Sequence, residues 1–288
     1  MITVMTPTYN RAYILDNAYQ SLLKQTDKDF LWLIVDDGST DDTETLVQKW
    51  MDEKKIRIEY LKKPNGGKAS ALNLAIESLN TEYAVCLDSD DTFYPDTIRL
   101  AAEKLDTIRD DEAFCGIVAL RHNPDGTVMG GRDMPRDART VTAADLFVKW
   151  CLNTELICFY KTAVLQQYRF PTFEGEKFVS PAWMQYKVTE KYCYLPVWEK
   201  LCECEYVSDG LTKNKRRVIV KNPNGYSCVK RYSFNLAPTM KLRVKHGIMY
   251  DCGCILAKNR HWLEGVDHKI LACLLKPAAY IVCRRRFK

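Results

Sequence analysis

No stretch of this 288-residue sequence is apolar for long enough to cross a bilayer, because a spanning helix needs about 20 consecutive apolar residues. This absence argues against a processive synthase that builds its own membrane channel. Internal repeats and low-complexity linkers are absent as well. The length therefore suits one large α/β domain with an appendage, or two small domains. The opening residues Met-Ile-Thr-Val-Met-Thr are typical of a strand and not of a signal peptide.

An extracellular disulfide framework is also missing, although the chain has twelve cysteines. Three of them lie inside apolar runs and are expected to be buried in a reducing compartment: Cys86, Cys115 and Cys158. The pairs Cys202-x-Cys204 and Cys252-x-Cys254 have one intervening residue, whereas zinc ligands are usually separated by about two to four. No histidine spacing completes either pair, so we do not expect a zinc site.

The formal net charge is +5, and basic residues cluster in 213–217 and 284–288. Such runs suit a solvated surface, an anionic substrate or anionic lipid headgroups. No basic face with interleaved aromatic residues accompanies them, so a nucleic-acid partner is not expected. Residues 270–283 are largely apolar, with a Lys-Pro interruption, and lead into the second basic run. This pattern favours a helix lying on a membrane surface over a core helix with a basic end.

Strand-like and helix-like segments alternate through the first 120 residues. The expected strands are 2–6, 30–35, 56–61, 83–87 and 114–120. The expected helices are 12–23, a segment after Asp42, 69–79 and 98–108. This alternation predicts an α/β fold with a mostly parallel central sheet flanked by helices. From about residue 122 the pattern loosens into a loop over 122–140 and shorter elements over 141–235.

Polar segments follow three of the expected strands. They are Thr6–Asn10, Asp36–Ser39 and Asp88–Asp91. In parallel sheets, ligands bind beyond the carboxyl ends of the strands. The side chains most suited to chemistry are therefore expected to gather at one edge of the sheet.

The most informative of these segments is Asp88-x-Asp90-Asp91. Three carboxylates within four residues repel one another, and a divalent cation would relieve that repulsion. Their hard oxygen ligands suit Mg²⁺ or Mn²⁺, which commonly bind substrate phosphates as well. The alternative is a solvated acidic turn that caps the next helix.

The two earlier segments have the chemistry of a nucleoside site. A carboxylate in Asp36-Asp37-Gly38 can accept an N–H of a pyrimidine base, and Tyr9 can stack on one. The alternatives are an ordinary helix N-terminus and a plain strand-to-helix connection.

Taken together, these strings resemble the family 2 inverting glycosyltransferases, which have the GT-A fold. The strings are Thr-Pro-Thr-Tyr-Asn-Arg (6–11), Val-Asp-Asp-Gly-Ser-Thr-Asp (35–41), Asn-Gly-Gly-Lys-Ala-Ser-Ala-Leu-Asn (65–73) and Leu-Asp-Ser-Asp-Asp (87–91). The resemblance is specific over about residues 1–110. It continues more faintly through Gly-Glu-Lys-Phe (175–178) and Asp-Gly-Leu-Thr (209–212), which look like bacterial capsule or surface-polysaccharide transferases.

The resemblance implies a role for each matching residue. Nucleoside contacts would come from Thr6, Tyr9 and Asp37, with Lys68 near the base or diphosphate, Asp88 on ribose or metal-bound water, and Asp90 with Asp91 on Mn²⁺ or Mg²⁺. Relatives carry an acidic catalytic base where this chain has Ser180-Pro181. Glu176 and Glu174 are the nearby candidates for that base, and Glu176 is preferred, with a structural carboxylate as the alternative. The diphosphate would be clamped by basic residues of the 213–217 run, namely Lys213, Lys215, Arg216 and Arg217.

The implied function is metal-dependent, inverting transfer of a sugar from a nucleotide-diphosphate donor to a hydroxyl of a glycan or lipid-linked glycan. The implied organisation is a donor half (1–120), an acceptor half of the same domain (121–235) and a helical tail (236–288). The expected location is the cytoplasm, peripheral at the inner face of a bacterial membrane, in surface-polysaccharide biosynthesis.

Two other functions remain open at this point. A nucleotidyltransferase would need a glycine- and basic-rich loop after the first strand, and Thr6–Arg11 has no glycine. A P-loop is disfavoured because Lys62 stands at its first glycine position. A protein that binds a nucleotide sugar without turning it over is the second alternative, suggested by Ser180-Pro181.

Overall fold

The computed structural model describes residues 1–152, 154–204 and 214–287, which form two compact units. The first unit comprises 1–142, 152–169 and 188–205, and the second comprises 143–151, 170–187 and 206–288, apart from the residues outside the described ranges. Strands on both sides of residue 120 share one sheet, and the division into a donor half (1–120) and an acceptor half (121–235) of one domain stays a prediction.

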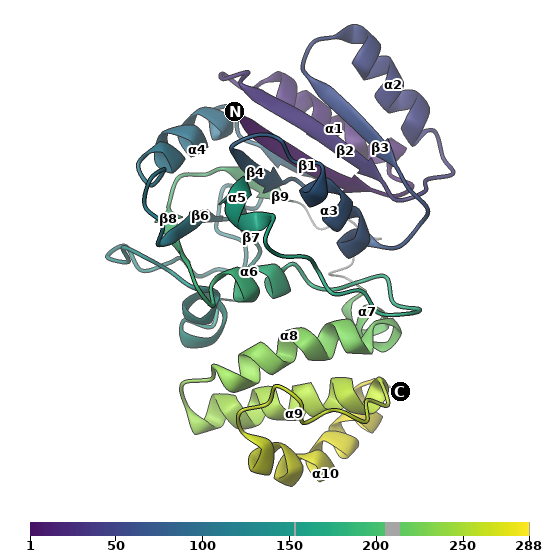
Figure 1. The fold of residues 1–288 in the computed structure, drawn as a ribbon, viewed down its shortest axis with the longest axis vertical. Helices are drawn as coiled ribbons and strands as arrows, with labels where there is room; N and C mark the ends of the chain where they lie inside the picture. Colours follow the sequence, from purple (N-terminus) through teal and green to yellow (C-terminus); the bar gives the residue numbers. More distant parts are fainter. Residues whose placement is uncertain (153, 205–213, 288) are drawn as a thin grey trace. The chain divides into compact units, whose positions relative to one another are not determined.

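The first unit is built on a seven-stranded sheet with the order β3-β2-β1-β4-β7-β6-β8 (Figure 1). Its strands are β1 (Ile2–Thr8), β2 (Phe30–Asp36), β3 (Ile58–Lys62), β4 (Tyr83–Cys86), β6 (Phe114–Leu120), β7 (Leu156–Lys161) and β8 (Cys193–Val197). Only β7 runs antiparallel to its neighbours. A two-stranded sheet pairs β5 (Asp91–Phe93) with β9 (Cys202–Cys204). The predicted α/β fold with a mostly parallel sheet is confirmed.

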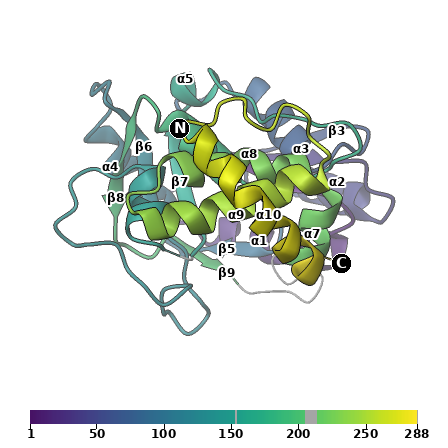
Figure 2. The ribbon, with the colours of Figure 1, turned by 90° about the horizontal axis from the view of Figure 1, so that it is seen from below.

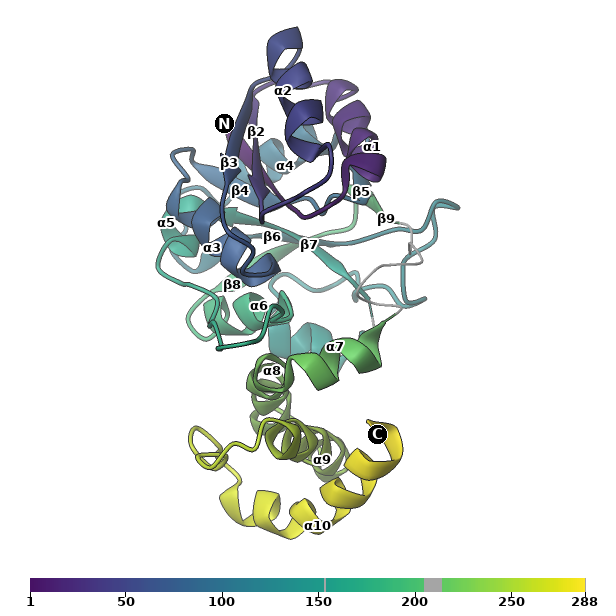
Figure 3. The same ribbon diagram turned by 90° about the vertical axis from the view of Figure 1, so that its right-hand side faces the viewer.

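Helices cover both faces of the sheet, as Figure 3 shows for α1 and α2 on one side and α3 on the other. The helices of this unit are α1 (Ala12–Leu23), α2 (Thr43–Glu53), α3 (Lys68–Glu77), α4 (Thr97–Asp106) and α5 (Thr162–Leu165). β2 is buried along all seven residues because it is covered on both faces. The apolar stripes that predicted these helices face the sheet.

An aromatic stack joins α1 and α2 to the sheet. The ring centroids of Tyr19 and Trp50 are 4.4 Å apart, and those of Trp32 and Trp50 are 5.6 Å apart. All three rings are buried. The indole of Trp32 also donates to Thr6 Oγ1 over 2.9 Å, so β1 and β2 are tied by side chains as well as by their ladder.

The second unit is helical. Its elements are the π-helical turn η1 (Asp145–Lys149) and the helices α6 (Ala182–Val188), α7 (Lys215–Lys221), α8 (Pro223–Asn235), α9 (Met240–Leu256) and α10 (Lys269–Arg286). α9 packs between α8 and α10, and Figure 2 shows α10 lying across α9. Gly253 lets α8 approach closely, since a Cβ there would lie 2.9 Å from the side chain of Ser227. Among the described residues, no helix is both long and apolar enough to span a membrane.

Candidate active site

The polar segments that follow the strands lie at one edge of the first unit. β1 runs parallel to β2 and β4, so their carboxyl ends share that edge. β7 runs in the opposite direction, and its first residue therefore lies there too. At this edge the Asp37 amide donates to the Thr8 carbonyl over 2.8 Å, and the Leu87 amide donates to the Met5 carbonyl over 3.0 Å.

The Asp37 carboxylate binds the loop that leads into α3. Its Oδ1 accepts from the Gly66 amide at 2.9 Å and from Lys63 Nζ at 2.7 Å, and its Oδ2 accepts from the Gly67 amide at 2.6 Å. Gly67 has a φ of +90°, which glycine adopts readily. A carboxylate offers about four acceptor sites, so these three hydrogen bonds leave about one on Oδ2. The role of Asp37 at a base edge stays a prediction.

The turn after Asp37 requires glycine. Gly38 has a φ of +82°, and a Cβ there would lie 3.0 Å from the Asn65 amide nitrogen and 3.1 Å from the Lys63 carbonyl oxygen. These are backbone atoms, which cannot swing aside. The turn and the loop over 63–67 therefore approach each other closely, and this contact fixes the Asp37 carboxylate.

Lys68 connects the same loop to the acidic segment. Its Nζ lies 2.5 Å from Asp88 Oδ1. Burial alone would lower the pKa of Lys68, but the Asp88 carboxylate raises it above its usual value. Burial alone would raise the pKa of Asp88, but Lys68 and Arg121 hold it well below its usual range. Both side chains are therefore charged, and Asp37, Lys68 and Asp88 belong to one connected set.

Arg121, which directly follows β6, is a site residue that the sequence patterns did not single out. Its buried guanidinium contacts Asp91, and its Nη1 lies 3.4 Å from Asp88 Oδ2 and 3.5 Å from Glu155 Oε2. Its Nε donates to the Leu156 carbonyl over 3.1 Å. The position of Arg121 in the sequence could have predicted it as a site residue, because it directly follows an expected strand, as Asp88 does.

Of the two predicted metal ligands, Asp90 is the accessible one. Its Oδ2 lies 4.0 Å from Arg11 Nη1, and burial together with the Asp88 charge raises the pKa of Asp90. Asp91 is only 5% exposed and paired with Arg121, and burial raises the pKa of Asp91 to about 7 although Arg121 opposes this. Asp91 is thus paired with Arg121, whereas Asp90 is the more accessible carboxylate, and the predicted metal contacts of both residues stay predictions.

Side-chain cations offset the repulsion among the three carboxylates. Lys68 and Arg121 supply positive charge at Asp88 and Asp91. Repulsion alone therefore does not require a metal, and a metal bound by this protein stays a prediction. The hard oxygens of Asp90 still fit Mg²⁺ or Mn²⁺, ions that need only one or two carboxylates when phosphate oxygens and water complete the shell.

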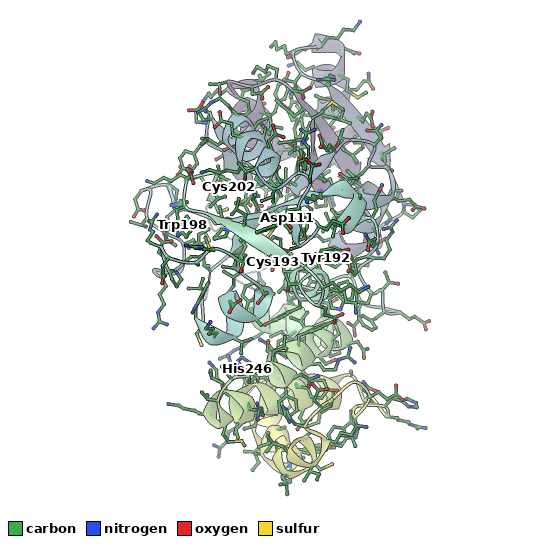
Figure 4. All side chains as sticks on the ribbon, turned by 60° about the vertical axis from the view of Figure 1, so that its left-hand side comes forward. Asp111, Tyr192, Cys193, Trp198, Cys202 and His246 are labelled. Carbon is green, nitrogen blue, oxygen red and sulfur yellow. The ribbon has the colours of Figure 1, made fainter. Side chains whose placement is uncertain are left out.

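Asp91 also lies beside Cys202 and Cys204 of β9, and one ligand atom from each falls within 4.8 Å of the others. Figure 4 places Cys202 in the first unit. Arg121 Nη1 lies 3.5 Å from Cys204 Sγ, so a guanidinium already supplies positive charge there. Burial raises the pKa of the Cys204 thiol far above its usual value, whereas zinc binds thiolates. These features do not favour zinc.

The two residues predicted from the first strand differ in accessibility. Tyr9 is 47% exposed, so its ring is open to a ligand. Thr6 is completely buried, and its hydroxyl accepts from the Trp32 indole. The pleat of β1 turns the Thr6 side chain into the core, and the predicted nucleoside contact of Thr6 stays a prediction.

Glu176, the predicted base, belongs to the second unit and caps α8. Its Oε1 accepts from the amide and the side-chain nitrogen of Asn224, both at 2.8 Å, and its Oε2 accepts from the Gly225 amide at 2.8 Å. A carboxylate at a helix N-terminus satisfies free backbone donors and the helix dipole. The structural alternative for Glu176 thus has a specific basis, and its role as a base stays a prediction.

The predicted diphosphate clamp falls partly outside the described residues. Lys213 and the Asp-Gly-Leu-Thr string (209–212) lie outside them. Lys215, Arg216 and Arg217 open α7 in the second unit. Their role as a clamp stays a prediction.

With this geometry in place, the chain can be assigned to a family. Residues 3–168 match Glycosyl transferase family 2, which is more than half of the chain, and the protein belongs to that family. An uncharacterized glycosyltransferase from Rickettsia felis is 44% identical over 99 residues, which cover 34% of this chain and 16% of that protein. The matched segment is therefore a small part of that relative's length.

Two solved structures show the same fold. The protein TarS from S. aureus, solved with UDP-GlcNAc, superposes with a TM-score of 0.58 at 17% identity, covering 99% of this chain and 90% of that one. The mannosyltransferase PcManGT from Pyrobaculum calidifontis, solved with GDP-Man and Mn²⁺, gives 0.61 at 19% identity, covering 98% and 80%. The predicted GT-A fold is confirmed.

Proposed function

We propose that the protein is a glycosyltransferase that moves a sugar from a uridine diphosphate donor to a hydroxyl of a glycan or lipid-linked glycan, with inversion. The observation that carries this proposal is the connected set of Asp37, Lys68 and Asp88 at the strand ends. The fold shared with the UDP-GlcNAc complex of TarS supports the choice of donor. TarS is named a poly(ribitol-phosphate) β-N-acetylglucosaminyltransferase, which supports a role in surface-polymer synthesis at the inner face of the membrane.

The donor base would lie against Tyr9 and Asp37. The exposed Tyr9 ring offers a stacking surface, and the remaining acceptor site on Asp37 Oδ2 would accept the N–H of a uracil ring. Lys68 and Arg121 would set the potential around the diphosphate. Because both are already paired with Asp88, their charge is held in place before the donor arrives, which is the preorganisation that electrostatic catalysis needs.

Asp90 would hold Mn²⁺ or Mg²⁺ together with the donor diphosphate. When bound, such a metal neutralises the charge that builds on the departing diphosphate. The fit rests on the hard, accessible carboxylate of Asp90. The Mn²⁺ in the PcManGT complex supports metal use in this fold.

We propose Glu155 as the base. Its side chain is 38% exposed at the edge where β7 begins, 3.5 Å from the guanidinium that also contacts Asp88. The acceptor hydroxyl would give its proton to Glu155 as its oxygen bonds to the anomeric carbon. The bond from that carbon to the diphosphate oxygen breaks, and the electron pair leaves with the diphosphate.

A thermal-shift titration with UDP and Mn²⁺ tests the donor site. We expect UDP to raise the melting temperature only when metal is present, and Asp90→Asn to remove that shift. Asp110→Asn, which changes an exposed aspartate of the first unit, is the matched control and should keep it. Equal stabilisation by UDP in excess chelator would overturn the metal role.

A protein that binds nucleotide sugars without turnover is the second candidate. It is favoured by Ser180-Pro181 and by the engagement of Glu176 at α8. Donor hydrolysis and transfer measured over a broad panel of acceptors would separate the two functions. Binding with no turnover of any donor would support this second candidate.

A further inference from the structure

α10 presents an apolar face to solvent. Ile270, Leu274 and Ile281 are 80%, 72% and 56% exposed, and their spacing by four and seven residues places them on one side of the helix. The opposite side packs on α9, where the Cys252 thiol contacts the Ala279 carbonyl. Isoleucine and leucine side chains that stay in water lack the favourable free energy of transfer that burial would give them. The exposed apolar face of α10 is therefore suited to bind an apolar partner.

The charges on α10 have one sign. Residues 269–286 contain five lysines or arginines and no aspartate or glutamate. Lys269 opens the helix, and three exposed arginines, Arg284–Arg286, close it. Cations thus flank the apolar face at both ends, and a partner that covers it must be apolar in the middle and anionic around it.

Further cations converge beside α10 in the same unit. Burial is the main cause that lowers the pKa of Lys230 of α8 to about 8, and the nearby charges of Lys215, Lys245 and Arg286 act in the same direction. Clustered cations of this kind are stabilised by an anion.

Two other partners fit these observations poorly. A second copy of the chain, docked through the same face, would place arginines and lysines against arginines and lysines. A spanning arrangement would bury Lys276 and the terminal arginines in hydrocarbon, and α10 has 18 residues with Pro277 inside. A helix with an apolar face and cationic flanks lies in the plane of the interface instead.

We propose that the outer face of α10 docks on the surface of a bilayer that contains anionic phospholipids. Ile270, Leu274 and Ile281 enter the boundary between headgroups and acyl chains, and Arg284–Arg286 contact lipid phosphates. This inference goes beyond the proposed transfer reaction and does not depend on it. If both hold, docking brings the donor site to the membrane that carries a lipid-linked acceptor.

Co-sedimentation of the full chain with vesicles tests the docking. Vesicles of phosphatidylcholine with phosphatidylglycerol should bind the protein, and vesicles of phosphatidylcholine alone should bind it much more weakly. The triple variant I270S/L274S/I281S should lose at least about tenfold in vesicle affinity. Unchanged affinity in that variant would overturn the proposal, whatever the outcome of any assay of donor binding or transfer.

Two triple variants that remove the same charge test whether the arginines of α10 contribute to membrane binding. Replacing Arg284–Arg286 with Gln should lower affinity about a hundredfold at low salt. Replacing three exposed lysines of the first unit, Lys24, Lys49 and Lys54, removes the same charge and should leave affinity within about twofold. Equal losses in both triple variants would show a general charge effect and overturn the assigned surface.

A reporter on the intact apolar face guards against misfolded variants. Cys273 is exposed on α10, and in a C151S background it can carry a polarity-sensitive fluorophore. We expect its emission to shift to the blue with anionic vesicles and to be quenched by bromolipids. An unshifted emission from vesicle-bound protein, or a concentration-dependent dimer that buries the reporter without lipid, would contradict docking through this face.

Discussion

One buried guanidinium organises the acidic end of β4. Arg121 contacts Asp91 and lies within 3.5 Å of Asp88 and Glu155, so three carboxylates from two segments share one cation. A charge buried in this way is stable only with its partners. At the scale of the residue, the site therefore depends on Arg121 as much as on the aspartates that the sequence makes conspicuous.

The substitution Arg121→Met is expected to destabilise the fold by about 3–5 kcal/mol, because it leaves the buried Asp91 without a counter-charge. Chemical denaturation measures this loss. The double variant R121M/D91N should recover a large part of it, since the uncompensated charge is then gone. Equal stability of the single and double variants would contradict this account of the pair.

Glu155 and Glu176 are predicted to behave differently. E155Q should lower kcat by about 10²–10⁴-fold while donor affinity stays unchanged, because it removes the proposed base but no donor contact. E176Q should leave kcat unchanged and lower stability by about 1 kcal/mol, since it weakens the cap of α8. Steady-state kinetics together with thermal denaturation of both variants check this, and the reverse pattern would restore Glu176 as the base.

At the scale of the element, α9 carries a buried carboxylate within its packing. Asp251 is completely buried between the helices of the second unit, and neither oxygen has a hydrogen-bond partner in the described residues. Burial raises the pKa of Asp251 to about 7, although Lys276 opposes this. Asp251 is therefore protonated and uncharged at mildly acidic pH, whereas above pH 7 it carries a buried negative charge that destabilises the folded state.

The pH dependence of stability should report this group. In the unfolded chain the carboxyl loses its proton near pH 4, whereas the folded chain keeps it to about pH 7. Between these values the unfolded state binds fewer protons, so the contribution of Asp251 to stability falls as pH rises through this window. D251N should remove this fall and stabilise the protein above pH 7 by about 2–4 kcal/mol.

Urea denaturation at about pH 5 and about pH 8 measures the effect. The exposed Asp267 of the same unit provides the control variant D267N. Burial lowers the pKa of His246 to about 4, which works in the opposite direction, so the difference between wild type and D251N is the quantity to compare. A pH dependence that D251N leaves unchanged would exclude Asp251 as its source.

At the scale of the whole molecule, the first 120 residues were the predictable part. Apolar periodicity located the helix Ala12–Leu23 and the strand Phe114–Leu120 correctly and the other expected elements to within a few residues, whereas the short strand β5 was not expected. Arg121 and Glu155 were not predicted as site residues, because their importance comes from a contact between residues far apart in the sequence. The antiparallel direction of β7 was not predicted either, because no local sequence pattern indicates it. The hydrogen bonds of Glu176 are made with the start of α8, which begins at Pro223, 47 residues further along the chain. A short sequence motif around Glu176 cannot reveal such a contact.

Donor binding should be visible as protection at separated places in the chain. In hydrogen exchange with UDP and Mn²⁺, we expect slower exchange in 9–11, 36–38, 65–68 and 88–91 together, because these segments share one edge of the first unit. Without metal the last segment should lose its protection. Protection confined to a single segment would contradict a shared donor site.

The reversed direction of β7 has a consequence for how this protein can change. The chain leaves the sheet at Leu120 and re-enters it at Leu156, and these two residues face each other across adjacent strands. Everything between them is an excursion whose two stems are anchored side by side. We therefore expect the chain between the stem residues Arg121 and Glu155 to tolerate changes of length, while these two residues stay paired and the strands that present Asp37 and Asp88 keep their positions.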